Sequence, residues 1–144
     1  MSPDALPART ARFYQDLATL REGALPRMGE IFSEDITFTD PLQRARGLTE
    51  FRGLFTNMFK RYETVWFDDF EMVCSDDDFG LHYTMTMAMG VGPIFRVDMV
   101  SVYWVRGGKV YRQIDNYDVP STLFSSLPWA DKLYRALVGG VLLG

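Results

Sequence analysis

Four strand-like segments in the second half of the chain limit most strongly what it can fold into. They cover about residues 64–74, 79–89, 94–106 and 109–118. The turns between them read SDDD, GVGP and RGG, which are rich in residues that tolerate tight turn geometry. Consecutive strands joined by such short turns pair with one another in antiparallel fashion. This half of the chain therefore predicts an antiparallel meander.

Helical patterns precede the meander. Apolar residues recur at helical spacing in residues 9–21, 26–32 and 48–62. Gly23 stops the first pattern, and Pro26 lies in the first turn of the second. A short alternating strand, residues 35–40, stands between the second and third helices. Together the patterns predict one α+β domain over residues 1–144, with a curved antiparallel sheet wrapped around three N-terminal helices.

Composition narrows the possible partners. The chain has 144 residues, 47% of them hydrophobic, which is enough to build a real core. Its net charge of -4 gives no basic footprint, so we expect neither nucleic acid nor an anionic membrane surface as a partner. A small apolar molecule remains a possible ligand.

Two further features concern the cellular location. The N-terminus lacks a signal-peptide core, and the longest apolar stretch, residues 136–144, is too short to span a bilayer. The single cysteine, Cys74, excludes an internal disulfide and is expected to be a small buried hydrophobe. We therefore expect a cytoplasmic protein.

Alternation along the strands assigns side chains to two faces. In residues 79–89 the odd positions form an apolar row, expected to face the helices: Phe79, Leu81, Tyr83, Met85, Met87 and Met89. The only histidine, His82, belongs to the other face. In residues 94–106 the better apolar row includes Ser101, so this hydroxyl is expected to point inward. In residues 109–118 neither row is cleanly apolar, which indicates that polar side chains have a role on at least one face of this strand.

Asp40 shares the inward register of Ile36 and Phe38. Two interpretations stay open. An aspartate before Pro41 at a strand end often closes a turn. Alternatively, Asp40 shares a cavity with a second acid, Asp115 on the last strand, and such a pair separates into an acid and a base.

Several common site motifs are missing from the sequence. It contains no nucleophile elbow, phosphate-binding loop or dinucleotide fingerprint, and the SDDD run lacks the further ligands of a calcium loop. We therefore expect neither a metal site nor a cofactor.

Three stretches carry a family resemblance: FSEDITFTDPL, RGLTEFRGLF and VSVYWVRGGKVYRQIDNYD. In this order they resemble the nuclear transport factor 2-like superfamily, which includes ketosteroid isomerases, SnoaL-like polyketide cyclases and limonene-epoxide-hydrolase-like enzymes. The resemblance covers nearly the whole chain and implies a cone-shaped, cystatin-like fold.

The resemblance also implies roles for single residues. Asp40 matches the strand-end base of ketosteroid isomerases, and Tyr14 lies near the position of their oxyanion-binding tyrosine. Ser101 stands where those enzymes carry a second, acidic oxyanion donor, which is a departure from their pattern. Asp115 matches the last-strand acid of the cyclases and epoxide hydrolases. The arginine-aspartate pair of the epoxide hydrolases has no counterpart in LHYTM.

The leading hypothesis is therefore a cofactor-free enzyme that transfers protons on an apolar steroid-, polyketide- or terpenoid-like substrate, as an isomerase, cyclase or epoxide hydrolase does. Its expected catalytic residues are Asp40, Asp115, Tyr14 and Ser101. Its expected substrate-binding residues are Tyr83, Met85, Met87, Met99, Gln113, Tyr117 and Phe55. The alternative is a non-catalytic module of the same fold that binds a hydrophobic ligand or assembles as a homodimer through its outer sheet face.

The C-terminal segment, residues 129–143, shows an approximate helical stripe of apolar residues. We expect it either to close the open end of the cone or to cover a neighbouring molecule. Gly139 and Gly140 weaken the helix, so a third interpretation is that this segment acts as a mobile lid.

Overall fold

A computed structural model describes residues 1–143, so Gly144, the last residue of the apolar terminal stretch, lies outside it. The helices are α1 (Leu6–Leu20), the 3₁₀ stretch η1 (Arg21–Glu30), α2 (Leu48–Arg61), α3 (Val119–Phe124) and α4 (Pro128–Leu143). The strands are β1 (Phe32–Thr39), β2 (Arg44–Arg46), β3 (Thr64–Ser75), β4 (Asp78–Ala88), β5 (Ile94–Arg106) and β6 (Lys109–Asn116). The expected α+β class is confirmed.

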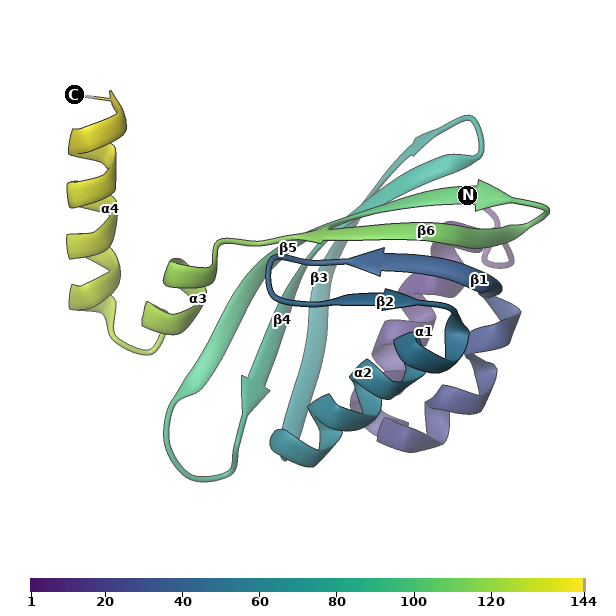
Figure 1. Ribbon diagram of the computed structural model, residues 1–144, viewed down its shortest axis with the longest axis horizontal. Coiled ribbons are helices and arrows are strands. Elements are labelled where there is room, and N and C mark those ends of the chain that lie inside the picture. Colours follow the sequence, from purple (N-terminus) through teal and green to yellow (C-terminus); the bar gives the residue numbers. More distant parts are fainter. Residues whose placement is uncertain (144) are drawn as a thin grey trace.

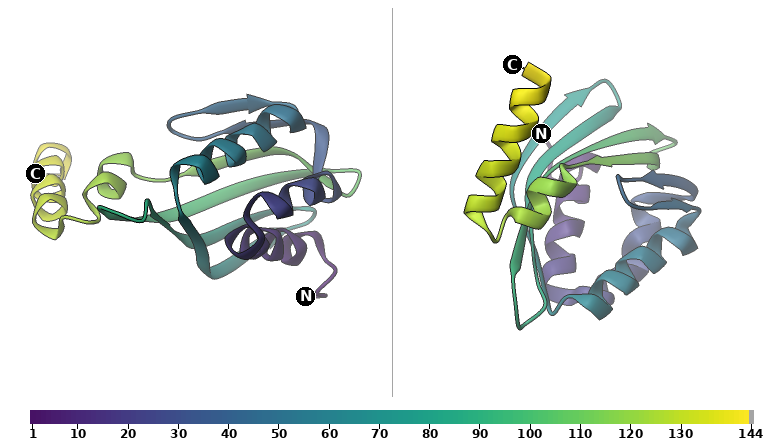
Figure 2. Two further views of the ribbon diagram at one scale, coloured as in Figure 1. Left: turned by 90° about the horizontal axis from the view of Figure 1, so that it is seen from below. Right: turned by 60° about the vertical axis from the view of Figure 1, so that its left-hand side comes forward.

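The strands form one curved sheet in the order β2-β1-β6-β5-β4-β3. Figure 1 shows α1 and α2 against one side of this sheet, and the two further views in Figure 2 agree. The sheet is mixed, because β1 pairs with β6 in parallel. The expectation of a purely antiparallel sheet was therefore wrong in this one pairing: the chain passes from β1 through α2 and the whole meander before β6 returns beside it. Strand β2 was missed because it has only three residues.

The second helix differs from the expectation. The segment runs from Arg21 to Glu30 as a 3₁₀ helix, and Phe32, expected at the helix end, opens β1 instead. Pro26 inside the segment and the glycines on either side of it disfavour a regular α-helix.

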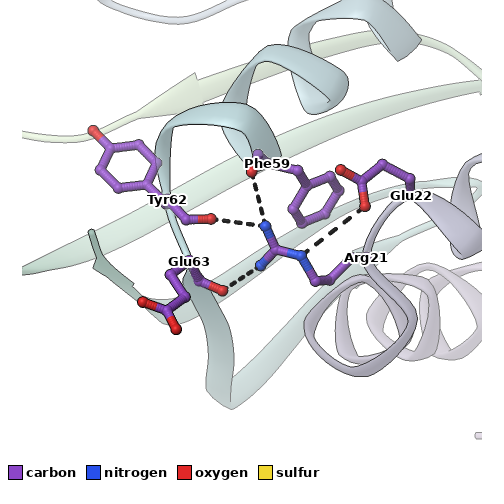
Figure 3. A network of polar contacts seen from close by, with 5 residues as sticks. All are labelled: Arg21, Glu22, Phe59, Tyr62 and Glu63. Carbon is purple, nitrogen blue, oxygen red and sulfur yellow. Dashed lines mark hydrogen bonds and ion pairs between the residues drawn. The ribbon is translucent and has the colours of Figure 1, made fainter. Parts of the chain in front are cut away.

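Arg21 ties the end of α1 to the end of α2, as Figure 3 shows. Its guanidinium donates hydrogen bonds to the backbone carbonyls of Phe59 and Tyr62, each at 2.8 Å, and to that of Glu63. The same group lies 4.9 Å from the centroid of the Phe59 ring. A cation at this place satisfies the last carbonyls of a helix. Arg21 therefore fixes the end of α2 that borders the cavity described below.

Two bulges change the register of the sheet. In β3 the pairing with β4 shifts between Asp68 and Glu71, where Asp69 has a φ of 57°. In β6 the pairing shifts so that Val105 faces Val110 while Trp104 faces Arg112. Tyr111 is the extra residue, and the inward row changes from even to odd positions there. This explains why neither row of the last strand looked apolar in the sequence.

The expected inner rows of β4 and β5 are largely confirmed. Phe79, Leu81, Tyr83, Val97 and Tyr103 are buried, and Ser101 is fully buried among them. Two expectations were wrong. Met89 lies past the end of β4 and is exposed, and Cys74 is exposed near the end of the edge strand β3.

The structure places His82 on the outer face, where its Nε2 lies 2.6 Å from Asp98 Oδ1. Among residues 1–143, no helix is both long enough and apolar enough to cross a membrane.

Candidate active site

A cavity of about 550 Å³ lies between the inner face of the sheet, α1, α2 and α3. Its volume falls within the range of small-molecule sites. Most of its lining is apolar. Of the expected substrate-binding residues, the structure places these around the cavity: Phe55, Tyr83, Met85, Met87, Met99 and Tyr117. Tyr14, Asp40 and Asp115 line it as well. The inward parity of the strands therefore placed these strand residues around one cavity.

Asp115 is the acid that the structure holds most closely. It lies on β6 directly opposite Ser101 on β5. Ser101 Oγ donates a hydrogen bond to Asp115 Oδ1 at 2.6 Å, and Gln113 Nε2 donates to the same oxygen at 2.8 Å. Both bonds fix the carboxyl group from behind, while its residue borders the cavity.

Burial raises the pKa of Asp115 to about 6, and the nearby Asp40 charge acts in the same direction. The hydrogen bonds from Gln113 and Ser101 favour the ionised form and oppose this rise. A carboxyl group with a pKa near the working pH can both accept and return a proton.

Three buried tyrosines belong to the same hydrogen-bonded group, and two of them, Tyr14 and Tyr83, also border the cavity. Tyr103 Oη donates to Tyr14 Oη at 3.1 Å, and Tyr83 Oη lies 2.9 Å from Ser101 Oγ. Burial raises the pKa of Tyr14, Tyr83 and Tyr103 above their ordinary value, and the Asp115 charge adds to each rise. All three phenols therefore stay neutral. Tyr103 was missed as a site residue, although it shares the inward row of Ser101.

Ser101 and Gln113 take different places from those expected. Neither borders the cavity; both are buried behind it. The hydroxyl of Ser101 is committed to Asp115, so it is not free to bind a substrate oxygen. Gln113, expected as a lining residue, instead bridges Tyr14 and Asp115 with its Nε2 atom.

The amide of Gln113 shows the constraint that the acid imposes. Its Oε1 is buried without a hydrogen-bond partner among the described residues. Exchanging the nitrogen and the oxygen would set Oε1 against the Asp115 carboxylate, which is a repulsive contact. The orphaned carbonyl is thus the cost of donating to an ionised Asp115.

Asp40 borders the cavity from the turn after β1. Its Oδ1 accepts hydrogen bonds from the backbone N–H groups of Leu42 and Gln43, at 2.7 and 2.8 Å. The Gln43 side chain reaches Oδ2 at 3.3 Å. The turn-closing interpretation of Asp40 is therefore confirmed, and the same carboxylate also faces the cavity.

Tyr117 brings a hydroxyl group to the cavity from the segment after β6. Burial and the charges of Asp40 and Asp115 raise its pKa to about 12. Tyr117 is therefore a neutral hydrogen-bond donor in the lining of the same cavity as the two acids.

Part of the lining was not foreseen. It comes from α2, from the turn after β1 and from α3, and includes Leu42, Met58, Arg61, Tyr62, Val119 and Leu123. The alternating strand pattern carries no information on helices that border a cavity at its rim. Among residues 1–143, no group of three or more histidine, cysteine, aspartate or glutamate residues could hold a metal ion.

Comparison with known proteins agrees with this architecture. The SnoaL-like domain matches residues 10–113, which is most of the chain. No protein with a curated description is significantly similar in sequence.

Solved structures show the same fold at low identity. One is a hypothetical protein from Catenulispora acidiphila with a ketosteroid isomerase-like fold, in complex with trimethylamine. It is 20% identical, has a TM-score of 0.71, and the match covers 88% of this chain and 94% of that one. A protein from Jannaschia sp. CCS1, provisionally described as a SnoaL-like polyketide cyclase, is 14% identical with a TM-score of 0.73, over 88% and 95% of the two chains. An LEH-like epoxide hydrolase of M. tuberculosis is 16% identical with a TM-score of 0.65, over 90% and 93%.

Proposed function

We propose that this chain, which belongs to the SnoaL-like domain family, is an enzyme that transfers protons on a mostly apolar small molecule. The observation that carries the proposal is Asp115, a carboxyl group in an apolar cavity whose pKa is raised to about 6 and whose Oδ1 is fixed by two hydrogen bonds. Perturbed acids of this kind concentrate at catalytic sites.

The chemistry that fits best is proton transfer next to a carbonyl group. The Asp115 carboxylate takes a proton from the carbon beside the carbonyl, and the C–H electron pair moves into an enolate. The Tyr117 hydroxyl group donates a hydrogen bond to the enolate oxygen, and Asp115 returns the proton to carbon. An apolar enclosure strengthens both interactions.

Asp40 is the second acid of this proposal. Its charge raises the pKa of Asp115 and so helps to bring that pKa closer to neutral pH. Ser101 holds Asp115 from behind the cavity, and Tyr14 borders the cavity and accepts a hydrogen bond from Gln113; neither binds the substrate oxygen in this scheme.

The substrate class follows from the lining. Aromatic rings and methionine side chains surround the cavity, and methionine adapts to irregular apolar shapes. A compact steroid-, polyketide- or terpenoid-like molecule with a ketone or epoxide oxygen fits such a site. The polyketide cyclase and epoxide hydrolase descriptions among the structural neighbours support the same class.

The direct test uses 2-decalone, an apolar ketone, in deuterated water. Wild-type protein is expected to accelerate exchange of the protons beside the carbonyl, followed by NMR, and Asp115→Asn is expected to abolish the acceleration. Limonene 1,2-epoxide serves as a second probe for ring opening. Asp77→Asn, at an exposed turn, is the matched control and should retain the full rate.

A full rate in Asp115→Asn would overturn the proposal. The competing function is a non-catalytic binding module, favoured by the apolar lining and by the use of Asp40 in a turn. Saturable binding of both probes without any turnover would support that module instead.

A further inference from the structure

We infer that α4 docks on the cavity mouth of a second copy of this chain, and that the second copy returns the same contact. The inference concerns assembly and is independent of the proposed chemistry. It starts from two apolar surfaces on one chain, neither of which the chain covers.

The first surface is one side of α4. Trp129, Leu133, Leu137 and Val141 follow one another at every fourth position and form a single stripe. Their exposed fractions are 68%, 53%, 61% and 85%. The structure buries no residue of α4. A soluble helix with such a stripe normally packs it against something.

The chain itself holds α4 away from its own body. Ser125 Oγ accepts a hydrogen bond from the Arg96 backbone at 3.0 Å, which docks α3 on β5. Arg135 then bridges Asp131 on its own helix and Ser121 on α3, at 3.0 Å each. Figures 1 and 2 show α4 beyond α3, separate from the sheet and from α1 and α2. The stripe therefore does not close the cone from which it projects.

The second surface is the part of the cavity rim next to α3, whose residues Val119, Thr122 and Leu123 line the cavity. Two leucines at this rim, Leu42 after β1 and Leu123 on α3, are exposed by 71% and 55%. Side chains from α2, including Met58 and Tyr62, continue the rim. An apolar rim of this kind is complementary to an apolar helix stripe.

The area involved decides between a single and a reciprocal contact. A helix of 16 residues is about 24 Å long and about 10 Å across, so half of its cylindrical surface is roughly 380 Å². One such contact is small for a stable interface. When each chain gives its helix and receives its partner's, each buries roughly 750 Å², close to the ~800 Å² per partner of a standard interface.

A second copy is thus the occupant that the arrangement favours. Each copy carries one helix stripe and one cavity rim. In a dimer with two-fold symmetry, each stripe covers the partner's rim, so two identical contacts cover all four apolar surfaces. In such a dimer the partner's stripe would also close the cavity, so each site would be completed by the other chain.

The first experiment measures molar mass by light scattering during size-exclusion chromatography. Wild-type protein is expected to elute as a dimer, and Leu137→Glu as a folded monomer, because Leu137 is exposed within one chain. Val91→Glu, which is also exposed but lies in the loop after β4, is the control and should stay dimeric. A monomeric wild type, or a Leu137→Glu variant that stays dimeric, would overturn the inference.

The second experiment identifies the contact. Both chains carry Cys74→Ser; one adds Leu123→Cys and the other Leu137→Cys. Oxidation of the mixture should give mainly the mixed disulfide dimer. A third variant carries Leu123→Cys and Leu137→Cys in the same chain. If oxidation gives only a disulfide within one chain, α4 covers its own cavity, and the contact between two chains is contradicted.

A membrane surface is the other candidate for the stripe. Flotation with vesicles of phosphatidylcholine and phosphatidylglycerol separates the two cases. The dimer hypothesis requires that wild-type protein stays below the vesicles. Flotation that Leu137→Glu abolishes would replace the second copy by a lipid surface.

Discussion

Asp115 and Asp40 border the same cavity, but the chain holds them in opposite ways. Asp115 belongs to the inner face of a central strand, and buried side chains donate both of its hydrogen bonds. Asp40 belongs to a turn at the rim, and backbone N–H groups donate to it. The contrast teaches that the buried surroundings raise the pKa of one acid, while the other acid mainly stabilises a turn at the rim.

The largest expected effect is on turnover. Asp115→Asn should lower the rate of exchange into 2-decalone by about 10²- to 10⁴-fold, the usual contribution of a positioned acid or base. Asp40→Asn should lower it by no more than about 10-fold, because the turn and the proton acceptor both survive. Equal losses in the two variants would erase the proposed difference between the acids.

The second effect is on stability as a function of pH. The folded chain raises the pKa of Asp115, so it holds this proton more tightly than the unfolded chain does. The resulting stability is fully present below about pH 4 and is lost as the pH rises through about 6. Asp115→Asn carries no charge at this position. At pH 8 its free energy of unfolding should therefore be about 1–3 kcal/mol larger than that of wild type, so the variant is the more stable protein.

Urea unfolding at pH 4 and at pH 8 checks this sign. The advantage of Asp115→Asn should disappear at pH 4. A variant that is less stable than wild type at pH 8 would show that the carboxylate is not strained by burial.

The third effect concerns the turn. Asp40→Ala removes the acceptor of two backbone hydrogen bonds and should lower the free energy of unfolding by about 1–2 kcal/mol. Asp40→Asn keeps an acceptor oxygen and should recover most of the loss. If Asp40→Ala unfolds like wild type in urea, the turn does not depend on this carboxylate.

The smallest effect is a shift of titration. Ser101→Ala removes a hydrogen bond that favours the ionised carboxylate, so the pKa of Asp115 should rise above about 6 by about one unit. Carbon-13 NMR of the labelled carboxyl group measures this shift. Tyr83→Phe is the matched control, since its hydroxyl group meets Ser101 and not Asp115. An unmoved titration in Ser101→Ala would mean that the short bond does not stabilise the charge.

Much of this arrangement could be predicted from the sequence because burial follows a period of two along a strand. The inner rows of β4 and β5 followed from that rule, and Asp40 was placed on the cavity side by the same reasoning. The roles of Asp40, Asp115 and Tyr14 in catalysis stay predictions.

The rest depended on interactions between distant segments. The parallel pairing of β1 with β6 leaves no local pattern in the sequence. The 3₁₀ path of η1 reflects its single proline, Pro26, its two glycines and its packing. The place of Gln113 behind the cavity could not be foreseen, because it requires knowing where the register of β6 shifts. The direction of α4 depends on two serine side chains that lie before it in the chain. Ser121 accepts a hydrogen bond from Arg135 of α4, and Ser125 accepts one from the backbone of β5.

The bulge at Tyr111 has a consequence for how this strand tolerates the loss of a residue. Val110 lies inward before it, and Gln113 and Asp115 lie inward after it. Removing that single residue while the hairpin at Gly107 and Gly108 is kept would remove the bulge but keep the pairs on either side of it, so Asp115 would stay opposite Ser101. The carboxyl group would therefore stay on the inner face, where we expect its pKa to remain raised. The bulge thus lets this strand lose one residue without turning its remaining side chains to the other face of the sheet.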